Sequence, residues 1–298
     1  GLEEKSIQGT LLLVDINSGI QQRVPLPGEA EVFFQRQLDA LYPFLQTRWT
    51  GHQRRKHVQI QPAFPEYREG QQETLQAVDQ ALNRGPIVFL EAPTGFGKTG
   101  IVLEQCLRRL QAGTHDRILY LTSKSTGQIQ AIRQLEKVIP WESNPPRYFQ
   151  IRNRAEHEPG ALELPAQSRS EEDLEALWLE SGISPYTLLE KQPLALERIL
   201  NLARETGLPA YEITRAALPF ADIWIADFNY IFSPSSRGLL DNVAGFKPEN
   251  TLLIVDEAHN LPSRTAAALS MEVRAEEWEY IREELRLRAA PPRMLSAL

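Results

Sequence analysis

Two short stretches of the sequence combine residue types that bind phosphate groups and ligate Mg²⁺. The first stretch is Ala92-Pro93-Thr94-Gly95-Phe96-Gly97-Lys98-Thr99, which follows a short apolar run at residues 87–91. Gly95 and Gly97 allow the backbone to turn its N–H groups around a phosphate, and the helix expected after the loop contributes its positive dipole end. Lys98 would reach the β- and γ-phosphate oxygens of a nucleoside triphosphate, and the Thr99 hydroxyl would ligate Mg²⁺. The stretch therefore predicts a nucleotide-binding loop, with alanine instead of glycine at its first position.

The second stretch is Asp256-Glu257-Ala258-His259, which directly follows the apolar residues 252–255. Asp256 would hold Mg²⁺ through water, and Glu257 would orient and polarise the water that attacks the γ-phosphate. We expect His259 to couple this catalytic site to a neighbouring domain by hydrogen bonding. An Asp-Glu pair at a strand end is common, but after a phosphate-binding loop it predicts the second half of a nucleotide-hydrolysing site.

Further polar residues precede or follow these stretches. Arg68 and Gln71 come before the loop, at a place from which a side-chain amide can reach an adenine edge, although this signal is weak alone. A second cluster ends the strand expected at residues 117–122 and contains Ser123, Lys124, Thr126 and Gln128. These groups suit phosphate oxygens, but Ser125 or Thr126 would serve equally well as a helix N-cap.

Apolar strands and helical patterns alternate along the chain and predict how the two stretches are positioned. The strand candidates are residues 87–91, 117–122, 222–227 and 251–256. Helical patterns between them favour an α/β fold, with a mainly parallel sheet and helices on both faces. Because ligands of such sheets bind at the carboxyl ends of the strands, both stretches are expected to lie at one edge of the sheet.

Three regions follow from this pattern. We expect an appendage at residues 1–60, a nucleotide-binding domain at residues 61–139 and 218–298, and a mostly helical insertion at residues 140–217. Within the appendage, strand patterns at residues 10–16 and 20–26 predict a β-hairpin, and residues 29–46 predict a helix. The appendage carries no evident chemistry.

Two features of the appendage allow a second interpretation. Residues 48–56 hold three arginines and a lysine, which favours a basic linker with a solvated face over a contact to nucleic-acid phosphates. Asp15 faintly resembles the acidic strand of restriction-type nucleases, but the partner lysine and the second acid are missing. A packing module is therefore the favoured interpretation of the hairpin.

The composition limits the classes of protein to be considered. The chain has 298 residues, 42% hydrophobic content and a net charge of -7, which predicts a globular protein without global attraction for nucleic acid. It has one cysteine, so it cannot form an intrachain disulfide or a cysteine-built metal cluster. No apolar run reaches the roughly 20 residues of a membrane span, and no leader opens the chain. We therefore expect a cytoplasmic protein that does not contact a membrane.

Four ordered motifs resemble a known family. They are Tyr-Arg-Glu-Gly-Gln, Ala-Pro-Thr-Gly-Phe-Gly-Lys-Thr, Asp-Phe-Asn-Tyr-Ile-Phe-Ser-Pro and Asp-Glu-Ala-His-Asn-Leu. Together they look like the first motor domain of superfamily 2 helicases of the XPD/DinG group, over roughly residues 60–275. The resemblance implies a RecA-like P-loop NTPase domain, with ATP and Mg²⁺ as cofactors. It also implies an ATP-driven translocase on single-stranded DNA.

The resemblance also implies roles for single residues. Arg68 and Gln71 would lie near the nucleotide, and residues 124–128 would lie near the DNA backbone. Asn229 is a further expected DNA contact. Among the aromatic residues, Phe228 and Tyr230 would line the DNA path or pack inside, whereas Trp224 is expected in the core because it sits in a buried strand pattern.

The sequence departs from that family in two respects. Relatives carry four cysteines for an iron-sulfur cluster in the insertion, whereas the only cysteine here, Cys106, lies outside it. A cluster needs thiolates, so we expect none, and the five histidines show no zinc-ligand spacing. Nothing after Asp256 is long enough for the second RecA-like domain, which would supply an arginine for phosphoryl transfer. We therefore expect this chain alone to bind ATP weakly and to hydrolyse it slowly or not at all.

Three functions are compatible with these residues. The favoured one is an ATP-dependent DNA helicase or translocase, with single-stranded DNA and a second RecA-like domain as partners. The alternative is a nucleotide-dependent switch or remodeller that acts on RNA or protein. A non-catalytic DNA-binding scaffold ranks last, because every residue of the hydrolytic site is present in the sequence.

Overall fold

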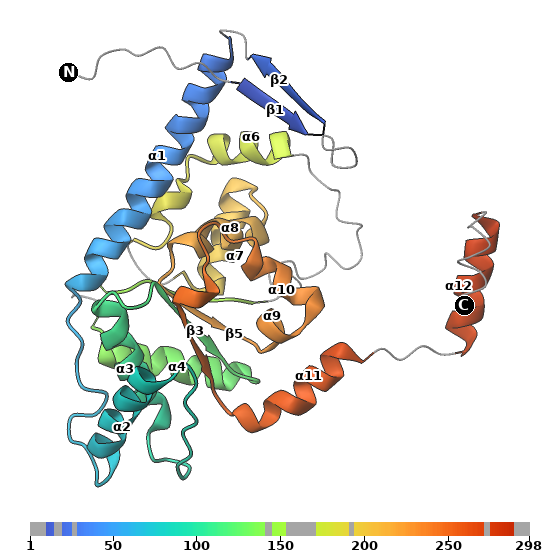
Figure 1. Cartoon of the computed structure of the whole chain (residues 1–298). Helices are drawn as coiled ribbons and strands as arrows, with labels where there is room; N and C mark the ends of the chain where they lie inside the picture. The colour runs from blue at the N-terminus through green and yellow to red at the C-terminus, as the bar shows by residue number, and fades with distance from the viewer. Residues whose placement is uncertain are drawn as a thin grey trace, which may run out of the picture.

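A four-stranded parallel sheet forms the centre of the protein (Figure 1). The computed structural model describes residues 10–14, 20–25, 29–140, 145–152, 171–190, 194–270 and 275–288. The sheet has the order β4-β5-β3-β6, with strands β3 (Arg117–Leu121), β4 (Tyr148–Gln150), β5 (Ile223–Ala226) and β6 (Thr251–Val255). Ile118 of β3 pairs with Ile223 of β5 on one side and with Leu252 of β6 on the other. The mainly parallel α/β sheet predicted from the sequence is confirmed.

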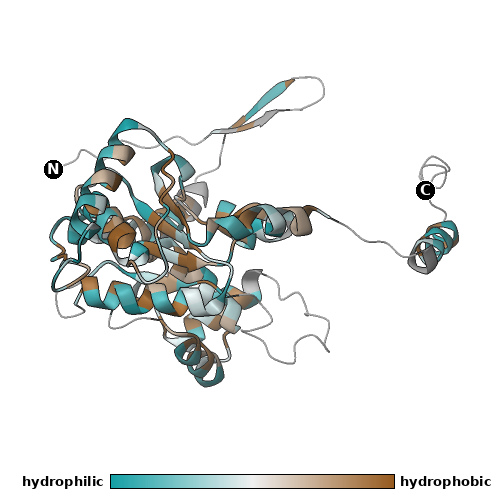
Figure 2. Cartoon of the chain, turned by 90° about the horizontal axis from the view of Figure 1, so that it is seen from below, coloured by the Kyte–Doolittle hydropathy of each residue, from teal (hydrophilic) through white to brown (hydrophobic). Residues whose placement is uncertain are grey.

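Successive residues of β3 point to opposite faces of the sheet, and each face is covered by helices. Ile118 and Tyr120 pack against residues of helices α3 (Lys98–Gln111) and α4 (Ser125–Val138). Leu119 and Leu121 pack against the other cluster, which draws on helices α7 (Leu196–Thr206), α8 (Ala210–Ala217) and α10 (Pro234–Asp241). Figure 2 shows hydrophobic residues gathered where these helices meet the sheet. The prediction of helices on both faces is confirmed.

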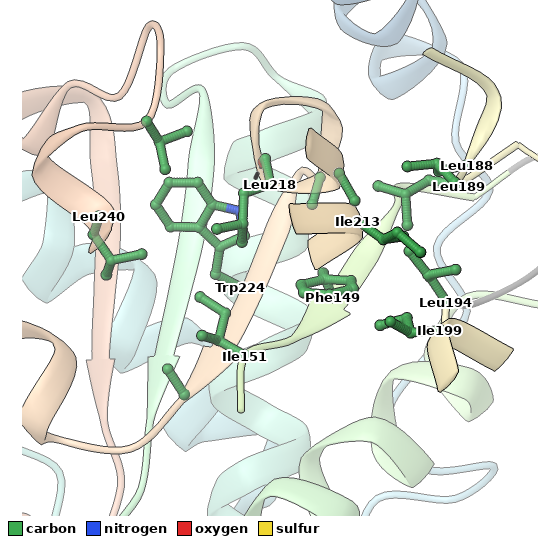
Figure 3. Packing of buried hydrophobic residues seen from close by; sticks show 14 of the residues in the cluster. Phe149, Ile151, Leu188, Leu189, Leu194, Ile199, Ile213, Leu218, Trp224 and Leu240 are labelled. Carbon is green, nitrogen blue, oxygen red and sulfur yellow. Dashed lines mark hydrogen bonds between the residues drawn. The ribbon is translucent and has the colours of Figure 1, made fainter. Parts of the chain in front are cut away.

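Trp224 lies at the centre of the second cluster (Figure 3). Its ring is fully buried, and its indole N–H donates to the carbonyl of Leu218 at 3.1 Å, so the one polar atom of the ring is satisfied. Phe228, which follows the same strand, is 1% exposed. The core position predicted for Trp224 is confirmed, and of the two alternatives for Phe228 the packed one holds because its ring is buried.

The apolar residues before the phosphate-binding loop do not form the expected strand. Residues 87–91 have no strand assignment, and Ile87 and Phe89 are 75% and 92% exposed. Strand β6 is an edge strand of the sheet, and no described residue pairs with its outer edge. A strand needs a neighbour for its backbone N–H and C=O groups, so β-propensity alone does not create one here.

The appendage consists of a hairpin and a long helix. Strands β1 (Thr10–Val14) and β2 (Gln21–Pro25) pair antiparallel, which confirms the predicted hairpin, while Asp15 lies outside the described residues. Helix α1 (Glu29–Lys56) has 28 residues and runs along one side of the body (Figure 1). The basic stretch is therefore the end of a helix rather than a linker. Its Arg54 and Arg55 side chains are only 11% exposed, so the predicted solvated face is wrong at these positions.

The predicted insertion is mostly helical where it is described, but it also contributes to the sheet. Strand β4 lies within residues 140–217, so the sheet continues into the region assigned to the insertion.

The other described elements of the chain are η2 (Pro185–Thr187), η3 (Leu218–Phe220), η4 (Pro248–Asn250), η5 (Ala258–Asn260), α2 (Gln71–Arg84), α6 (Glu171–Ser181), α9 (Asn229–Phe232), α11 (Leu261–Leu269) and α12 (Ala275–Leu287). No described helix has the length and apolar run needed to cross a bilayer.

Candidate nucleotide-binding site

Two glycines with positive φ shape the loop between residues 92 and 99. Gly95 has φ 80°, and Gly97, the N-cap residue of α3, has φ 97°. A Cβ atom on Gly97 would lie 2.5 Å from Cζ of Phe64 and 3.0 Å from Nε2 of Gln71. Both the backbone angle and the space thus require glycine at position 97. The residue lets the chain enter α3 in close contact with the segment before α2.

The ammonium group of Lys98 lies within the loop. Its Nζ donates to the carbonyl oxygen of Ala92 at 2.6 Å and to that of Pro93 at 3.2 Å. Lys98 is also the first residue of α3, where the backbone N–H groups have no partner inside the helix. One positive side chain and a helix N-terminus therefore meet at the same place, which suits an anionic phosphate group.

Gln71 and Arg68 contact the loop from the side. The buried Gln71 side chain accepts from the N–H of Arg68 at 2.8 Å and donates to the carbonyl of Phe96. Arg68 donates to the carbonyl of Gly95 at 3.4 Å. Gln71 thus links the loop to the backbone of Arg68 through the two ends of its amide, and an adenine contact would require it to give up these partners. The place near the loop agrees with the expectation for both residues, while their contact to a nucleotide remains a prediction.

Tyr120 joins the two predicted halves of the site. Its hydroxyl donates to Oδ2 of Asp256 at 2.6 Å and lies near the Thr99 side chain. Burial raises the pKa of Tyr120, and the carboxylate of Asp256 raises it further, so the phenol stays protonated and acts as a donor. This residue was not predicted from the sequence. The available signal was a single phenol among the aliphatic residues of strand β3.

The two acidic residues after β6 point in different directions. The N–H of Asp256 donates to the carbonyl of Leu121 at 2.8 Å, which continues the ladder and aims Asp256 at Tyr120. Glu257 has φ 52°, a left-handed conformation that costs roughly 1–3 kcal/mol in a non-glycine residue. This turn leaves the Glu257 side chain 56% exposed, with its Oε2 3.3 Å from Nδ1 of His259. His259 is itself 71% exposed, so its contact to another domain remains a prediction.

The cluster at the end of β3 divides into exposed and buried residues. Lys124 and Thr126 are exposed at the start of α4, and Asn229 is exposed at the start of α9. Gln128 is only 7% exposed, and its side-chain oxygen accepts from Nε2 of Gln150 at 2.7 Å. The side-chain oxygen of Gln128 is therefore used inside the protein, and the expected contact of Gln128 with a DNA backbone remains a prediction. Ser123 is also buried, and its carbonyl accepts from Arg264.

The available ligands suit Mg²⁺ with a bound triphosphate better than a transition metal. The Thr99 hydroxyl and the Asp256 carboxylate both lie near the Tyr120 hydroxyl, and oxygen ligands are those that Mg²⁺ prefers. No group of three His, Cys, Asp or Glu side chains that could hold a metal occurs in the described part of the chain. Cys106 lies on the buried side of α3, and burial raises the pKa of its thiol to about 12. It therefore contributes packing rather than a thiolate ligand.

Comparisons with known proteins point to one group of enzymes. Residues 172–278 match the DEAD_2 family model, and this segment contains β5, β6 and the Asp256-Glu257 pair. The chain is 37% identical over 78 residues to a regulator of telomere elongation helicase 1 homolog from Oryza sativa, which covers 26% of this chain and 7% of that protein. Over these segments the chain is similar to DNA helicases of the XPD-like group. The resemblance stated from the four motifs is confirmed.

Further XPD-like helicases match over larger or similar segments. The ATP-dependent DNA helicase CHL1 of Saccharomyces cerevisiae is 30% identical over 82 residues, which covers 28% of this chain and 9% of the relative. The general transcription and DNA repair factor IIH helicase subunit XPD of Schizosaccharomyces pombe is 21% identical over 223 residues, 65% of this chain and 28% of the relative. A solved structure described as an XPD helicase superimposes with a TM-score of 0.48 at 20% identity, over 67% of this chain and 34% of the other. The chain thus spans less than a third of the length of these curated relatives.

Proposed function

We propose that this chain is the first motor half of an ATP-dependent DNA helicase that moves on single-stranded DNA. The hydrogen bond of Tyr120 to Asp256, with Thr99 near the same hydroxyl, carries the proposal, because it relates the two predicted catalytic motifs to one point near the carboxyl ends of β3 and β6. The relation to XPD-like helicases supports the choice of reaction. RNA or protein remodelling uses the same kind of site and is the alternative that the experiment below addresses.

Each site residue has a role that its surroundings support. Lys98 and the first N–H groups of α3 would hold the triphosphate, and Thr99 with Asp256 would hold Mg²⁺. Bound Mg²⁺ neutralises charge on the phosphate oxygens. Glu257 is exposed beside Asp256 and would orient water for attack on the γ-phosphate.

The proposal also includes partners outside this chain. Lys124, Thr126 and Asn229 are exposed at the same carboxyl edge of the sheet, and we propose that they contact the DNA backbone. A second RecA-like domain would complete the ATP site with an arginine, so hydrolysis by this chain alone should be slow. The cysteine-poor composition gives no ligand set for an iron-sulfur cluster, and we propose that the motor works with ATP and Mg²⁺ alone.

Titration calorimetry with Mg-ATP tests the site. The Lys98→Ala variant is expected to bind at least about tenfold more weakly than the unchanged chain, because it loses a charge-assisted contact to phosphate. The matched control is Lys137→Ala, an exposed lysine on the last turn of α4, which should bind like the unchanged chain. Equal binding by Lys98→Ala and the unchanged chain would overturn the nucleotide site.

Whether the partner is DNA or RNA is tested by repeating the Mg-ATP titration with a single-stranded nucleic acid present. Single-stranded DNA is expected to strengthen Mg-ATP binding, because both ligands would favour the same arrangement of the loop and α4. Strengthening by single-stranded RNA and not by DNA would instead select the remodeller. A Lys124→Ala variant that responds to DNA like the unchanged chain would show that DNA lies elsewhere.

A further inference from the structure

A second polar site lies at the opposite edge of the sheet from the nucleotide loop. Arg117 is the first residue of β3, Asp222 immediately precedes β5, and Arg147 immediately precedes β4, so all three lie at the amino ends of the strands. The last three turns of α1 pack over this edge. Together they enclose a pocket of about 520 Å³, which we call the arginine pocket. This volume suits a small ligand.

Positive charge exceeds negative charge in the arginine pocket. The lining contains five guanidinium groups, those of Arg48, Arg54, Arg55, Arg117 and Arg147. They face three carboxylates, those of Asp116, Glu190 and Asp222. Burial lowers the pKa of His52, and Arg55 lowers it further, so the imidazole is neutral and accepts a hydrogen bond from Arg55. The pocket therefore holds about two uncompensated positive charges near neutral pH.

The carboxylate of Asp222 is already fully used. Its two oxygens each lie 2.6 Å from a guanidinium nitrogen, one from Arg54 and one from Arg55. Burial by itself would raise the pKa of Asp222, but the attraction of these two arginines and the N–H of Arg147 outweigh it and lower the pKa. Asp222 thus pairs with the two arginines at the end of α1. Within the described residues, no carboxylate bonds the guanidinium of Arg117.

Arg117 is a buried cation with unused donor capacity. It is 6% exposed, stacks 3.8 Å from the ring centre of Trp224 and donates from Nη2 to the carbonyl of Pro219. Its Nη1 is buried and has no hydrogen-bond partner in the described part of the chain, and the same holds for Nε of Arg54. Burial and the neighbouring Arg48 lower the pKa of Arg117 to about 9. The charge persists at neutral pH, but holding it without an anion is costly.

We propose that the arginine pocket binds a small dianion of the phosphate class, either free phosphate or a phosphate monoester. Guanidinium groups present paired donors that match phosphate oxygens, and the excess of two positive charges matches a dianion rather than a neutral ligand. The proposal does not depend on the helicase function. The nucleotide loop lies at the carboxyl edge, so its phosphate binding is separable from binding at the amino edge.

The experiment is a calorimetric titration of inorganic phosphate in the Lys98→Ala background, at constant ionic strength. This background removes the lysine of the nucleotide loop. We expect saturable binding with a dissociation constant below about 10 mM. Arg117→Met, which removes the unpartnered donor and keeps apolar volume, is expected to weaken binding at least tenfold. The matched control is Arg237→Gln, an arginine 60% exposed on α10, which should change binding less than twofold.

Two additions keep the test decisive. Arg48→Gln alters a more exposed guanidinium of the same pocket and is expected to weaken binding at least threefold, so it decides the question if Arg117→Met unfolds. Adenosine monophosphate replaces phosphate in a parallel titration. Tighter binding of the nucleotide identifies a monoester ligand, and equal or weaker binding identifies free phosphate. Absence of saturation, or equal affinity in the arginine variants and the Arg237→Gln control, would overturn the proposal.

Discussion

The two edges of the sheet are built in different ways. At the carboxyl edge, backbone geometry dominates: two left-handed glycines, a helix N-terminus and one left-handed glutamate place Lys98 and Glu257. At the amino edge, side chains from distant segments dominate. Two arginines of α1 pair with Asp222, which follows the insertion in the sequence. The first arrangement is encoded in short local runs of sequence. The second depends on long-range contacts between buried charges. Because removal of one partner leaves the other charge buried and unpaired, this edge is the more sensitive to substitution.

Asp222→Asn is expected to have the largest effect on stability. It leaves Arg54 and Arg55 buried without their carboxylate, which costs about 3–5 kcal/mol. Urea unfolding of the variant and of Asp241→Asn, whose ion pair with Arg237 is largely exposed, makes the comparison. The control should lose less than about 1 kcal/mol. Similar losses in both variants would show that the amino edge is not specially dependent on its buried ion pairs.

The same carboxylate predicts a pH dependence. The pKa of Asp222 is lowered in the folded protein, so its stabilisation is present above the unfolded pKa of about 4 and is lost as the pH falls through the folded value. The unchanged protein should therefore lose stability as the pH falls below about 4. Asp222→Asn should lack this part of the acid sensitivity, measured as the slope of unfolding free energy against pH. A slope equal to that of the unchanged protein would exclude the proposed linkage.

Gly97→Ala is expected to have the next largest effect and to act on the carboxyl edge. The new Cβ would require an unfavourable φ and would clash with Phe64, at a cost of about 1–3 kcal/mol, and it should weaken Mg-ATP binding as well. Gly113→Ala is the control, because φ is 74° there but no atom lies within 4 Å of the added Cβ. It should show only the backbone cost of about 1 kcal/mol. Thermal unfolding and calorimetry measure both effects, and equal losses would argue against the close contact.

Tyr120→Phe is expected to have a smaller effect that links the two halves of the nucleotide site. It keeps the buried ring but removes the hydroxyl shared by Thr99 and Asp256, which should lower stability by roughly 1–2 kcal/mol. Mg-ATP affinity should fall several-fold. Tyr148→Phe removes a comparable hydroxyl that bonds the exposed Glu136, and its ATP affinity should be unchanged. Loss of affinity in both variants would show a general packing effect.

His259→Ala is expected to have the smallest effect on the isolated chain. Its contact with Glu257 joins two exposed side chains, so the free energy of unfolding should change by less than about 0.5 kcal/mol. Chemical unfolding and ATP titration provide the measurement. A larger change would reveal a structural role for His259 that its exposure does not suggest.

These differences explain which parts of the protein were predictable from sequence. Strands β3, β5 and β6 and the loop around Lys98 follow from short apolar runs and glycine positions. Tyr120 was missed because only tertiary structure places its hydroxyl between two motifs. Residues 87–91 were misassigned because their apolar character predicts burial, while strand formation depends on a neighbour outside the local sequence.

The burial of the arginines at the amino edge was predicted wrongly for a related reason. Four basic residues near the end of α1 look like a solvated surface in sequence, because the carboxylate that pairs with Arg54 and Arg55 lies far along the chain. The buried environment of Arg117 likewise depends on Trp224 and on the return of the chain after α8. No local pattern contains that information.

The outer edge of β6 has a practical consequence for work in solution. Its backbone is unpaired among the described residues, Leu253 is 47% exposed, and Phe89 is almost fully exposed. Such an edge is a template on which a second polypeptide can add a strand. Purified samples should therefore sediment faster as concentration rises, and a lysine in place of Leu253 should suppress that self-association while leaving the interior of the sheet intact.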